Sequence, residues 1–261
     1  MTRNPRSPPH PLACLWAADA RRCQEEATDS VSQPKRSFGR AAAAEEGSDG
    51  RRAGTVAEGT GHARTLILDA AEWLFAEHGI SSVSNRQIGA AAGQGNTSAV
   101  GYHFGSKDEL IRALIRRFDG EAEFFRAAMV NQIGDSAQLR EWVRCLVFPY
   151  TETLAARRPP TWYARLNAQI MADPVLRNIQ LEEAVSASLQ QVIRGLEVST
   201  PELPAAVLRE RELMAGHILI QTCADFERGL ADAPASGKTW RKVGSGLVDA
   251  LVGLWSAPVS R

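Results

Sequence analysis

The chain has 261 residues, of which 44% are hydrophobic and 23% are charged, and this composition fits a folded chain of one or two domains. It excludes a collagen-like or low-complexity protein for the bulk of the chain. The 30 Lys and Arg residues balance 30 Asp and Glu residues, so the formal net charge is zero. Binding to nucleic acid or to a membrane would therefore need a local surface rather than the field of the whole protein.

The cysteines predict neither a disulfide framework nor a metal site. Cys14, Cys23, Cys145 and Cys223 are far apart and form no Cys-x-x-Cys pair or Cys/His ligand pattern. This usage favours a reducing cytoplasm. No apolar run approaches the roughly 20 residues that span a bilayer, so we expect no membrane partner. We also expect no cofactor.

Residues 1–60 differ in character from the rest of the chain. They carry early prolines and then Arg, Ala, Glu, Gly and Ser in no periodic order. Such a segment buries too little apolar surface to offset its conformational entropy. We therefore predict a disordered tail over residues 1–60.

From residue 61 onward the patterns are helical, and stripes and caps mark the first four helices. An apolar stripe runs from Ile67 to Phe75 at helical spacing, and Gly79 follows it as a left-handed C-terminal residue. Ser84 and Gln87 form a capping box that opens a second helix, which ends at Gly93. A third short helix is predicted over residues 96–104, and a capping box over residues 106–109 opens a fourth.

Longer helices follow, separated by proline and glycine breakers. We expect them at residues 137–157, 161–172, 174–197, 203–231 and 239–256. The predicted fold class is thus all-α, with no alternating strand pattern and no hairpin signal.

Two short helices joined by a glycine-led turn predict a helix-turn-helix, in which the second helix enters the major groove. Residues 94–103 supply the small and polar side chains that a groove helix needs. Basic residues are few, but Arg64, Arg86 and Lys107 are predicted near helix N-termini, where backbone amides and the helix dipole suit phosphate. Local placement can therefore support DNA binding despite the neutral total.

Residues 63–79, 84–93 and 102–110, with the run Tyr-His-Phe-Gly-Ser-Lys at 102–107, resemble the DNA-binding domain of the tetracycline-repressor (TetR) family of regulators. Residues 247–254 also resemble members of that family. The resemblance covers about 50 residues. The segment between Gly93 and Phe104 is one residue longer than is typical, and we expect the extra residue in the turn at Gly95 and Asn96.

The resemblance implies a helix-turn-helix domain over residues 61–110 and a helical effector-binding and dimerisation domain over residues 111–258. It implies a transcription regulator, usually a repressor, that binds a palindromic duplex as a homodimer and is released by a small apolar or amphipathic effector. Phosphate contacts are expected from Tyr102 and Lys107, flanked by Thr65 and Ser84. With the bases read by the third helix, the DNA-binding candidates are Arg64, Thr65, Ser84, Arg86, Asn96, Thr97, Ser98, Gly101, Tyr102, His103 and Lys107.

An effector pocket in the second domain needs apolar walls and a few polar groups. The candidates are aromatic, sulfur-containing or polar side chains on the predicted long helices: Trp142, Phe148, Trp162, Tyr163, Met171, His217 and Gln221. The alternative is that they only fill the core, which leaves a helical DNA-binding protein without an effector. An enzyme is not expected, because no phosphate loop, nucleophile elbow or zinc-protease motif is present.

The last two helices are predicted to form the dimer interface. In residues 239–256, an apolar stripe includes Leu247, Leu251 and Leu254, widened by Val248 and Trp255. A comparable face is predicted on residues 203–231. An apolar stripe at a chain end can pack inward and still leave surface for a second copy.

Overall fold

The computed structural model describes residues 52–96, 98–133, 138–183, 186–232 and 239–259. Thr97 and residues 1–51 of the predicted tail lie outside the described residues. Within the described ranges the chain is helical with no strand, which confirms the predicted all-α fold class. The helices are α2 (Arg52–His78), α3 (Asn85–Ala91), α4 (Ala99–Phe104), α5 (Lys107–Ile133), α6 (Leu139–Ala156), α7 (Tyr163–Ala172), α8 (Pro174–Glu183), α9 (Ala187–Ser199), α10 (Ala205–Asp232) and α11 (Trp240–Ser256).

The first three helices form the small unit that the sequence predicts. Ser84 caps α3 in a complete capping box, and Gly79 and Gly93 adopt the positive φ angles expected after a helix end. Val100 and Phe104 of α4 are buried with Ile88 of α3 against the apolar face of α2. The helix-turn-helix is therefore held by one shared core.

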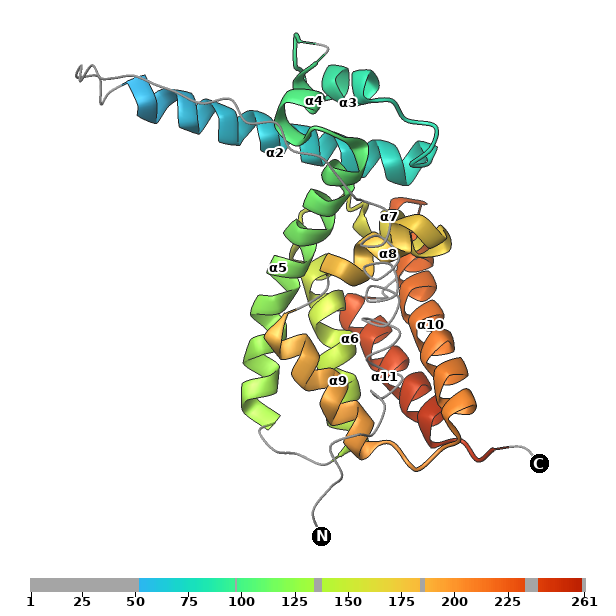
Figure 1. Cartoon of the computed structure of the whole chain (residues 1–261). Helices are drawn as coiled ribbons and strands as arrows, with labels where there is room; N and C mark the ends of the chain where they lie inside the picture. Colours follow the sequence, from blue (N-terminus) through green and yellow to red (C-terminus); the bar gives the residue numbers. More distant parts are fainter. Residues whose placement is uncertain (1–51, 97, 134–137, 184–185, 233–238, 260–261) are drawn as a thin grey trace, which may run out of the picture.

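Helix α2 begins at Arg52, so its first nine residues overlap the tail predicted over residues 1–60. The start of α2 extends away from α3 and α4 (Figure 1). Once a helix is nucleated by its packed part, each added residue gains a backbone hydrogen bond at little further entropic cost. Propagation from the packed part of α2 accounts for a helix over this segment.

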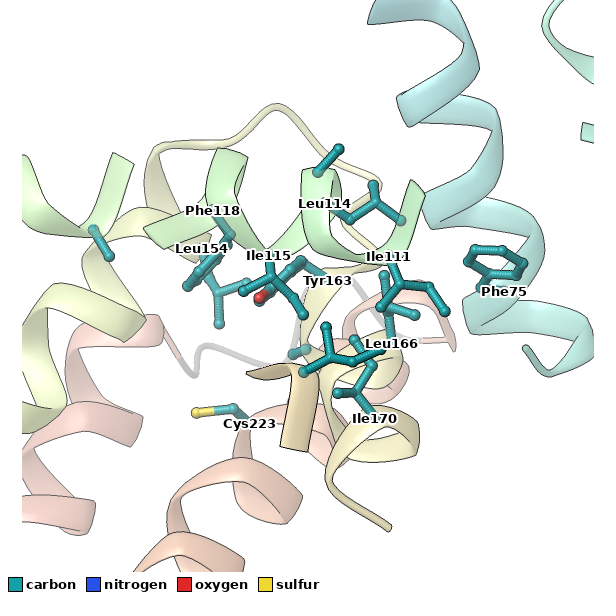
Figure 2. Packing of buried hydrophobic residues seen from close by; sticks show 14 of the residues in the cluster. Phe75, Ile111, Leu114, Ile115, Phe118, Leu154, Tyr163, Leu166, Ile170 and Cys223 are labelled. Atoms are coloured by element: carbon teal, nitrogen blue, oxygen red, sulfur yellow. The ribbon is translucent and has the colours of Figure 1, made fainter. Parts of the chain in front are cut away.

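Helices α5 to α11 form the second unit, below α2 in Figure 1, with α7 and α8 at the junction. Helix α11 packs along α6 and α10, and α10 packs along α7. One continuous core joins the two units, as Figure 2 shows for Phe75 of α2, Ile111 of α5 and Leu166 of α7. No helix in the described part of the chain is both long and apolar enough to cross a membrane.

The single helix predicted over residues 174–197 is instead two, α8 and α9. Ser186 starts α9 as its N-cap, and its hydroxyl accepts a hydrogen bond from the Leu189 amide. The same hydroxyl accepts a bond from Arg126 of α5. A serine side chain can accept a hydrogen bond in place of a backbone carbonyl. The helix is therefore interrupted before Ser186, whose hydroxyl accepts from the Leu189 amide and from Arg126.

Most residues predicted for the dimer stripe of α11 face inward, and Leu254 is half-buried. Leu247, Val248, Leu251 and Trp255 are all buried within the protomer, and Leu251 has no exposed surface. These side chains are on the side of α11 that packs against α6 and α10. An interface with a second copy would have to use the opposite side of α11.

Candidate nucleic-acid interface and ligand cavity

Helix α4 presents the residues expected for a groove helix. Tyr102 is 80% exposed, and Ser98 and Gly101 are also exposed. No atom lies within 4 Å of where a Gly101 Cβ would stand, so nothing inside the protein requires glycine there. The absence of an internal reason is consistent with close approach of another molecule to this surface.

Arg64 fixes α4 to α2. Its Nη1 donates to the His103 carbonyl oxygen (2.9 Å), and its guanidinium lies over the Phe104 ring, 4.3 Å from the centroid. The His103 ring is half-buried and meets the exposed Tyr102 ring edge-on at 5.1 Å. Arg64 and His103 therefore hold the C-terminal end of α4 in place as well as lying at the candidate DNA surface.

Lys107 is engaged within the protein. Its Nζ donates to the Val83 carbonyl oxygen (2.7 Å), directly before the α3 cap, and lies over the Phe75 ring at 5.4 Å. Burial lowers the pKa of this ammonium, and the neighbouring Asp108 carboxylate opposes the shift. Lys107 thus joins the start of α5 to the start of α3, a role that the sequence resemblance did not indicate.

The remaining predicted DNA contacts divide into two groups. Ser84, Arg86 and Asn96 are exposed or near the surface on the same unit, and the Arg86 side chain makes no hydrogen bond or ion pair among the described residues. The Asn96 side-chain oxygen accepts from the Ser98 amide (2.9 Å), which leaves its amide nitrogen available. Thr65 does not join this group, because it lines a charged pocket beside Trp162 on another side of α2.

A cavity of about 120 Å³ lies inside the second unit. Residues from each of the helices α5 to α11 line it. Most of its walls are apolar, but several polar side chains reach it as well. The polar and aromatic residues of the wall include Phe118, Asp119, Arg126, Tyr163, Asn167, Gln180, Glu212 and Trp255.

Two of the seven predicted effector residues, Tyr163 and Met171, line this cavity. The other five do not line it. Trp142 packs against Gly195 of α9, and Phe148 packs against Gly244 of α11, so both fill helix contacts. His217 and Gln221 are exposed, because the inward face of α10 carries Leu208, Glu212, Ala215 and Leu219 instead. Trp162 lies outside the cavity under the Arg165 guanidinium.

Helix α7 has one face in the cavity and another on α2. Tyr163, Asn167 and Met171 follow helical spacing and line the cavity. Gln169 faces the other way: its Nε2 donates to the carbonyl oxygens of Phe75 (2.8 Å) and Ala76 (3.3 Å), and its Oε1 accepts from the Ile80 amide (3.1 Å).

Arg165 adds a second connection on that face. Its Nη1 pairs with Glu77 of α2 (2.8 Å), while its amide donates to the buried Glu227 carboxylate of α10 (2.9 Å). Burial raises the pKa of Glu227, and its hydrogen bonds from the start of α7 oppose the rise. One ten-residue helix therefore contacts the cavity, α10 and the end of α2.

An ionic cluster forms a further link between the units. Arg157 donates to Glu72 of α2 (3.0 Å) and to Glu121 of α5 (2.8 Å). Its guanidinium lies over the rings of Phe118 and Tyr163, which stack at 3.8 Å and line the cavity. Hydrogen bonding and attraction from Glu121 and Glu72 raise the pKa of Arg157 despite its burial.

No three His, Cys, Asp or Glu side chains in the described ranges gather closely enough to hold a metal ion. The two cysteines that are described, Cys145 and Cys223, are buried, and burial raises the pKa of both thiols. A reactive thiolate is therefore not part of this site.

Residues 67–114 match the family model described as "Bacterial regulatory proteins, tetR family". No curated protein matches the sequence. Among solved structures, the chain is similar to a protein from Shewanella sp. PV-4 assigned to the tetR family of transcription regulators, with 20% identity over 74% of this chain and 96% of that one and a TM-score of 0.49. It is also similar to the TetR family transcriptional regulator PfmR from Thermus thermophilus (18% identity, 74% and 99% coverage, TM-score 0.46). A third similar structure is the multidrug binding protein EbrR complexed with imidazole (21% identity, 76% and 97% coverage, TM-score 0.45).

Proposed function

We propose a ligand-responsive function for this chain, which its DNA-binding domain identifies as a transcription regulator of the TetR family. A dimer binds a palindromic duplex through the α4 helices of its two protomers. A small molecule in the cavity of the second unit releases the duplex, so that the protein acts as a repressor.

The observation that carries this proposal is the double role of α7. A molecule that displaces Tyr163 or Asn167 in the cavity also displaces Gln169, which holds the end of α2. Because α4 is fixed to α2 by Arg64, a movement of α2 carries the groove helix with it. Half-sites on a duplex are about 34–36 Å apart for one helical turn, so a small change in the spacing of two α4 helices weakens binding to both at once.

On the DNA side, α4 reads the bases and its neighbours position the protein. Ser98, Gly101, His103 and the amide nitrogen of Asn96 supply base contacts, and Tyr102 and Arg86 contact phosphates. Thr97 belongs to the same reading group by sequence alone. Lys107 acts first through the Val83 carbonyl, by fixing where α3 begins.

Dimerisation uses the outer sides of α10 and α11. Leu213 and Met214 of α10 are 46% and 49% exposed, large values for apolar side chains. On α11 the exposed side carries Gly246, Ala250 and Gly253, whose small side chains allow close approach of a second helix. A two-fold axis between such faces forms a self-complementary contact.

The coupling can be tested without knowing the effector, by filling the cavity with a side chain. Gly216 lines the cavity, and no atom lies within 4 Å of where its Cβ would stand, so Gly216→Leu adds volume there without a backbone clash. Gly229→Leu on the same helix is the control, because that glycine is exposed with equally open surroundings. Affinity is measured by fluorescence anisotropy on a duplex selected from a random library.

We expect Gly216→Leu to weaken duplex binding about 5-fold to 150-fold, the range of common allosteric coupling energies, while the dimer stays folded. Gln169→Leu removes the hydrogen bonds of this side chain to α2 but keeps the Arg165–Glu77 pair, so it should reduce this effect in the double variant. A folded Gly216→Leu dimer that binds the duplex like the parent would contradict the coupling and favour a DNA-binding protein without an effector.

A further inference from the structure

Glu212 is an acidic side chain inside the cavity wall with no partner for its charge. The residue is 3% exposed, and neither carboxylate oxygen has a hydrogen-bond partner in the described part of the chain. Burial raises its pKa to about 7; Glu197 adds to the rise and Arg209 opposes it. A buried carboxylate without donors is costly, so its retention in an apolar wall calls for an explanation.

Asp119 reaches the same cavity from α5. Its Oδ2 is also buried without a hydrogen-bond partner among the described residues. Burial raises its pKa to about 6, Arg126 opposes this, and Glu183 and Glu123 add to it. Arg126 is already shared, because its Nη1 pairs with Glu123 (3.1 Å) and donates to Ser186 (3.4 Å).

The other unpaired polar atoms of the wall are balanced between acceptors and donors, so the surplus of acceptors comes from the carboxylates of Glu212 and Asp119. The side-chain oxygens of Asn167 and Gln180 are buried without donors among the described residues. On the donor side stand the Trp255 indole nitrogen, the Arg126 Nε and the Tyr163 hydroxyl, which can also accept. An amide can exchange its oxygen and nitrogen by a flip, but an ionised carboxylate only accepts. The cavity therefore offers surplus acceptor capacity and uncompensated negative charge.

The size and remaining walls limit what can fit. A cavity of about 120 Å³ is somewhat smaller than the roughly 150 Å³ cavity that admits benzene. The apolar wall includes Leu189, Ile193 and Leu219. A ligand must therefore combine a small apolar body with a compact group that carries several hydrogen-bond donors.

We propose that this cavity binds a small organic amine in its protonated form, with the ammonium group between the carboxylates of Glu212 and Asp119 and the hydrocarbon part against the leucine and isoleucine walls. The ligand class rests on the proposed function, because it names the kind of effector that the same cavity takes. An ammonium group supplies three donors and one positive charge, which matches the surplus of the wall. A carboxylate or phosphate ligand would instead add charge of the same sign as the two acids.

Isobutylamine, isobutanol and 3-methylbutanoate share one small branched hydrocarbon body and differ in charge, so they serve as probes. Binding of each to the full chain is measured by calorimetry at pH 8, where Glu212 and Asp119 are mainly ionised and an alkylamine is protonated. The variants are Glu212→Gln and Asp119→Asn, each close in shape to the parent. Glu210→Gln is the control, because Glu210 is exposed on the same helix.

We expect the amine to bind at least about tenfold more tightly than the alcohol, since hydrogen bonds to charged groups contribute more than neutral ones, and the carboxylate not to bind. Glu212→Gln should weaken amine binding about tenfold or more and change alcohol binding little, and Glu210→Gln should change neither. If Glu212→Gln does not fold, Asp119→Asn carries the same expectation.

Equal or tighter binding of the alcohol or the carboxylate, no binding of any probe, or unchanged amine affinity in both folded variants would overturn the proposal. Adding each probe to the protein–duplex complex separates this result from the proposed function. An amine that binds without weakening duplex affinity supports the cation site and contradicts release by an effector. A neutral probe that releases the duplex while the amine does not supports release by an effector and contradicts the cation site.

Discussion

The unpaired carboxylate of Glu212 makes a prediction about stability that needs no ligand. Its pKa is raised from 4.5 to about 7 by burial. The folded protein therefore holds this proton through a pH range in which the unfolded chain has lost it. The free energy of unfolding should fall as pH rises through that window, because ionisation is less favourable in the fold.

The magnitude follows from the shift, at about 1.4 kcal/mol for each pKa unit, which gives about 3 kcal/mol lost between about pH 4.5 and pH 8. Glu212→Gln cannot ionise and escapes this loss. For a chain of this size, about 1 kcal/mol changes Tm by about 2–4 °C. The Tm of Glu212→Gln minus that of the parent should therefore rise by about 6–12 °C across the same pH range.

Differential scanning fluorimetry at several pH values measures this difference, and subtraction removes the effect of every other titrating group common to both proteins. Glu210→Gln is the matched control, since an exposed carboxylate on the same helix should give a difference that does not change with pH. If the difference for Glu212→Gln is also flat with pH, then Glu212 ionises normally and the argument from its burial is refuted.

Three further predictions concern DNA binding and assembly. Gly101→Ala should weaken duplex binding. It should also raise Tm slightly, because alanine favours a helix and its Cβ meets open space. Gly120→Ala on α5 should raise Tm without weakening duplex binding. Arg86→Ala should flatten the slope of log K against log salt by about two per dimer. Lys107→Ala should change this slope less and should lower Tm, because the Lys107 ammonium donates to the Val83 carbonyl. A larger change of slope for Lys107→Ala than for Arg86→Ala would refute these roles. Met214→Arg should give folded monomers by sedimentation, and a dimer would place the interface elsewhere.

The features that the sequence predicted well are set by neighbours within a few residues. The capping box at Ser84 and the left-handed conformation of Gly79 depend on local backbone geometry, and the structure contains both. The stripe from Ile67 to Phe75 is also local, because one face of a helix repeats every three to four residues. The helices of the helix-turn-helix could therefore be predicted from the sequence without the tertiary structure.

The cavity was harder to predict because its lining depends on how α10 is turned, which distant helices decide. His217 and Gln221 were chosen for their polarity, yet they face outward, while Glu212 faces the cavity. A signal was present: Glu212 interrupts an apolar series at helical spacing with Leu208 and Ala215. An acidic residue within an apolar stripe is worth more attention than an aromatic one, since the aromatic residue has an ordinary place in a core.

The buried carboxylates of Glu212 and Asp119 suggest why a ligand in the cavity can act on α2. In the empty protein, burial of Glu212 costs free energy at neutral pH, and a cation recovers it on binding. That recovered free energy is comparable to the roughly 1–3 kcal/mol of typical allosteric coupling, so part of it can shift α7 while the remainder appears as affinity. We expect the shift at α7 because Tyr163 and Asn167 line the same cavity as the acids, whereas Gln169 on the same helix holds Phe75 and Ile80. A ligand that satisfied Glu212 without touching α7 would bind tightly and leave the duplex in place, since only a difference in affinity between the two states can move the equilibrium.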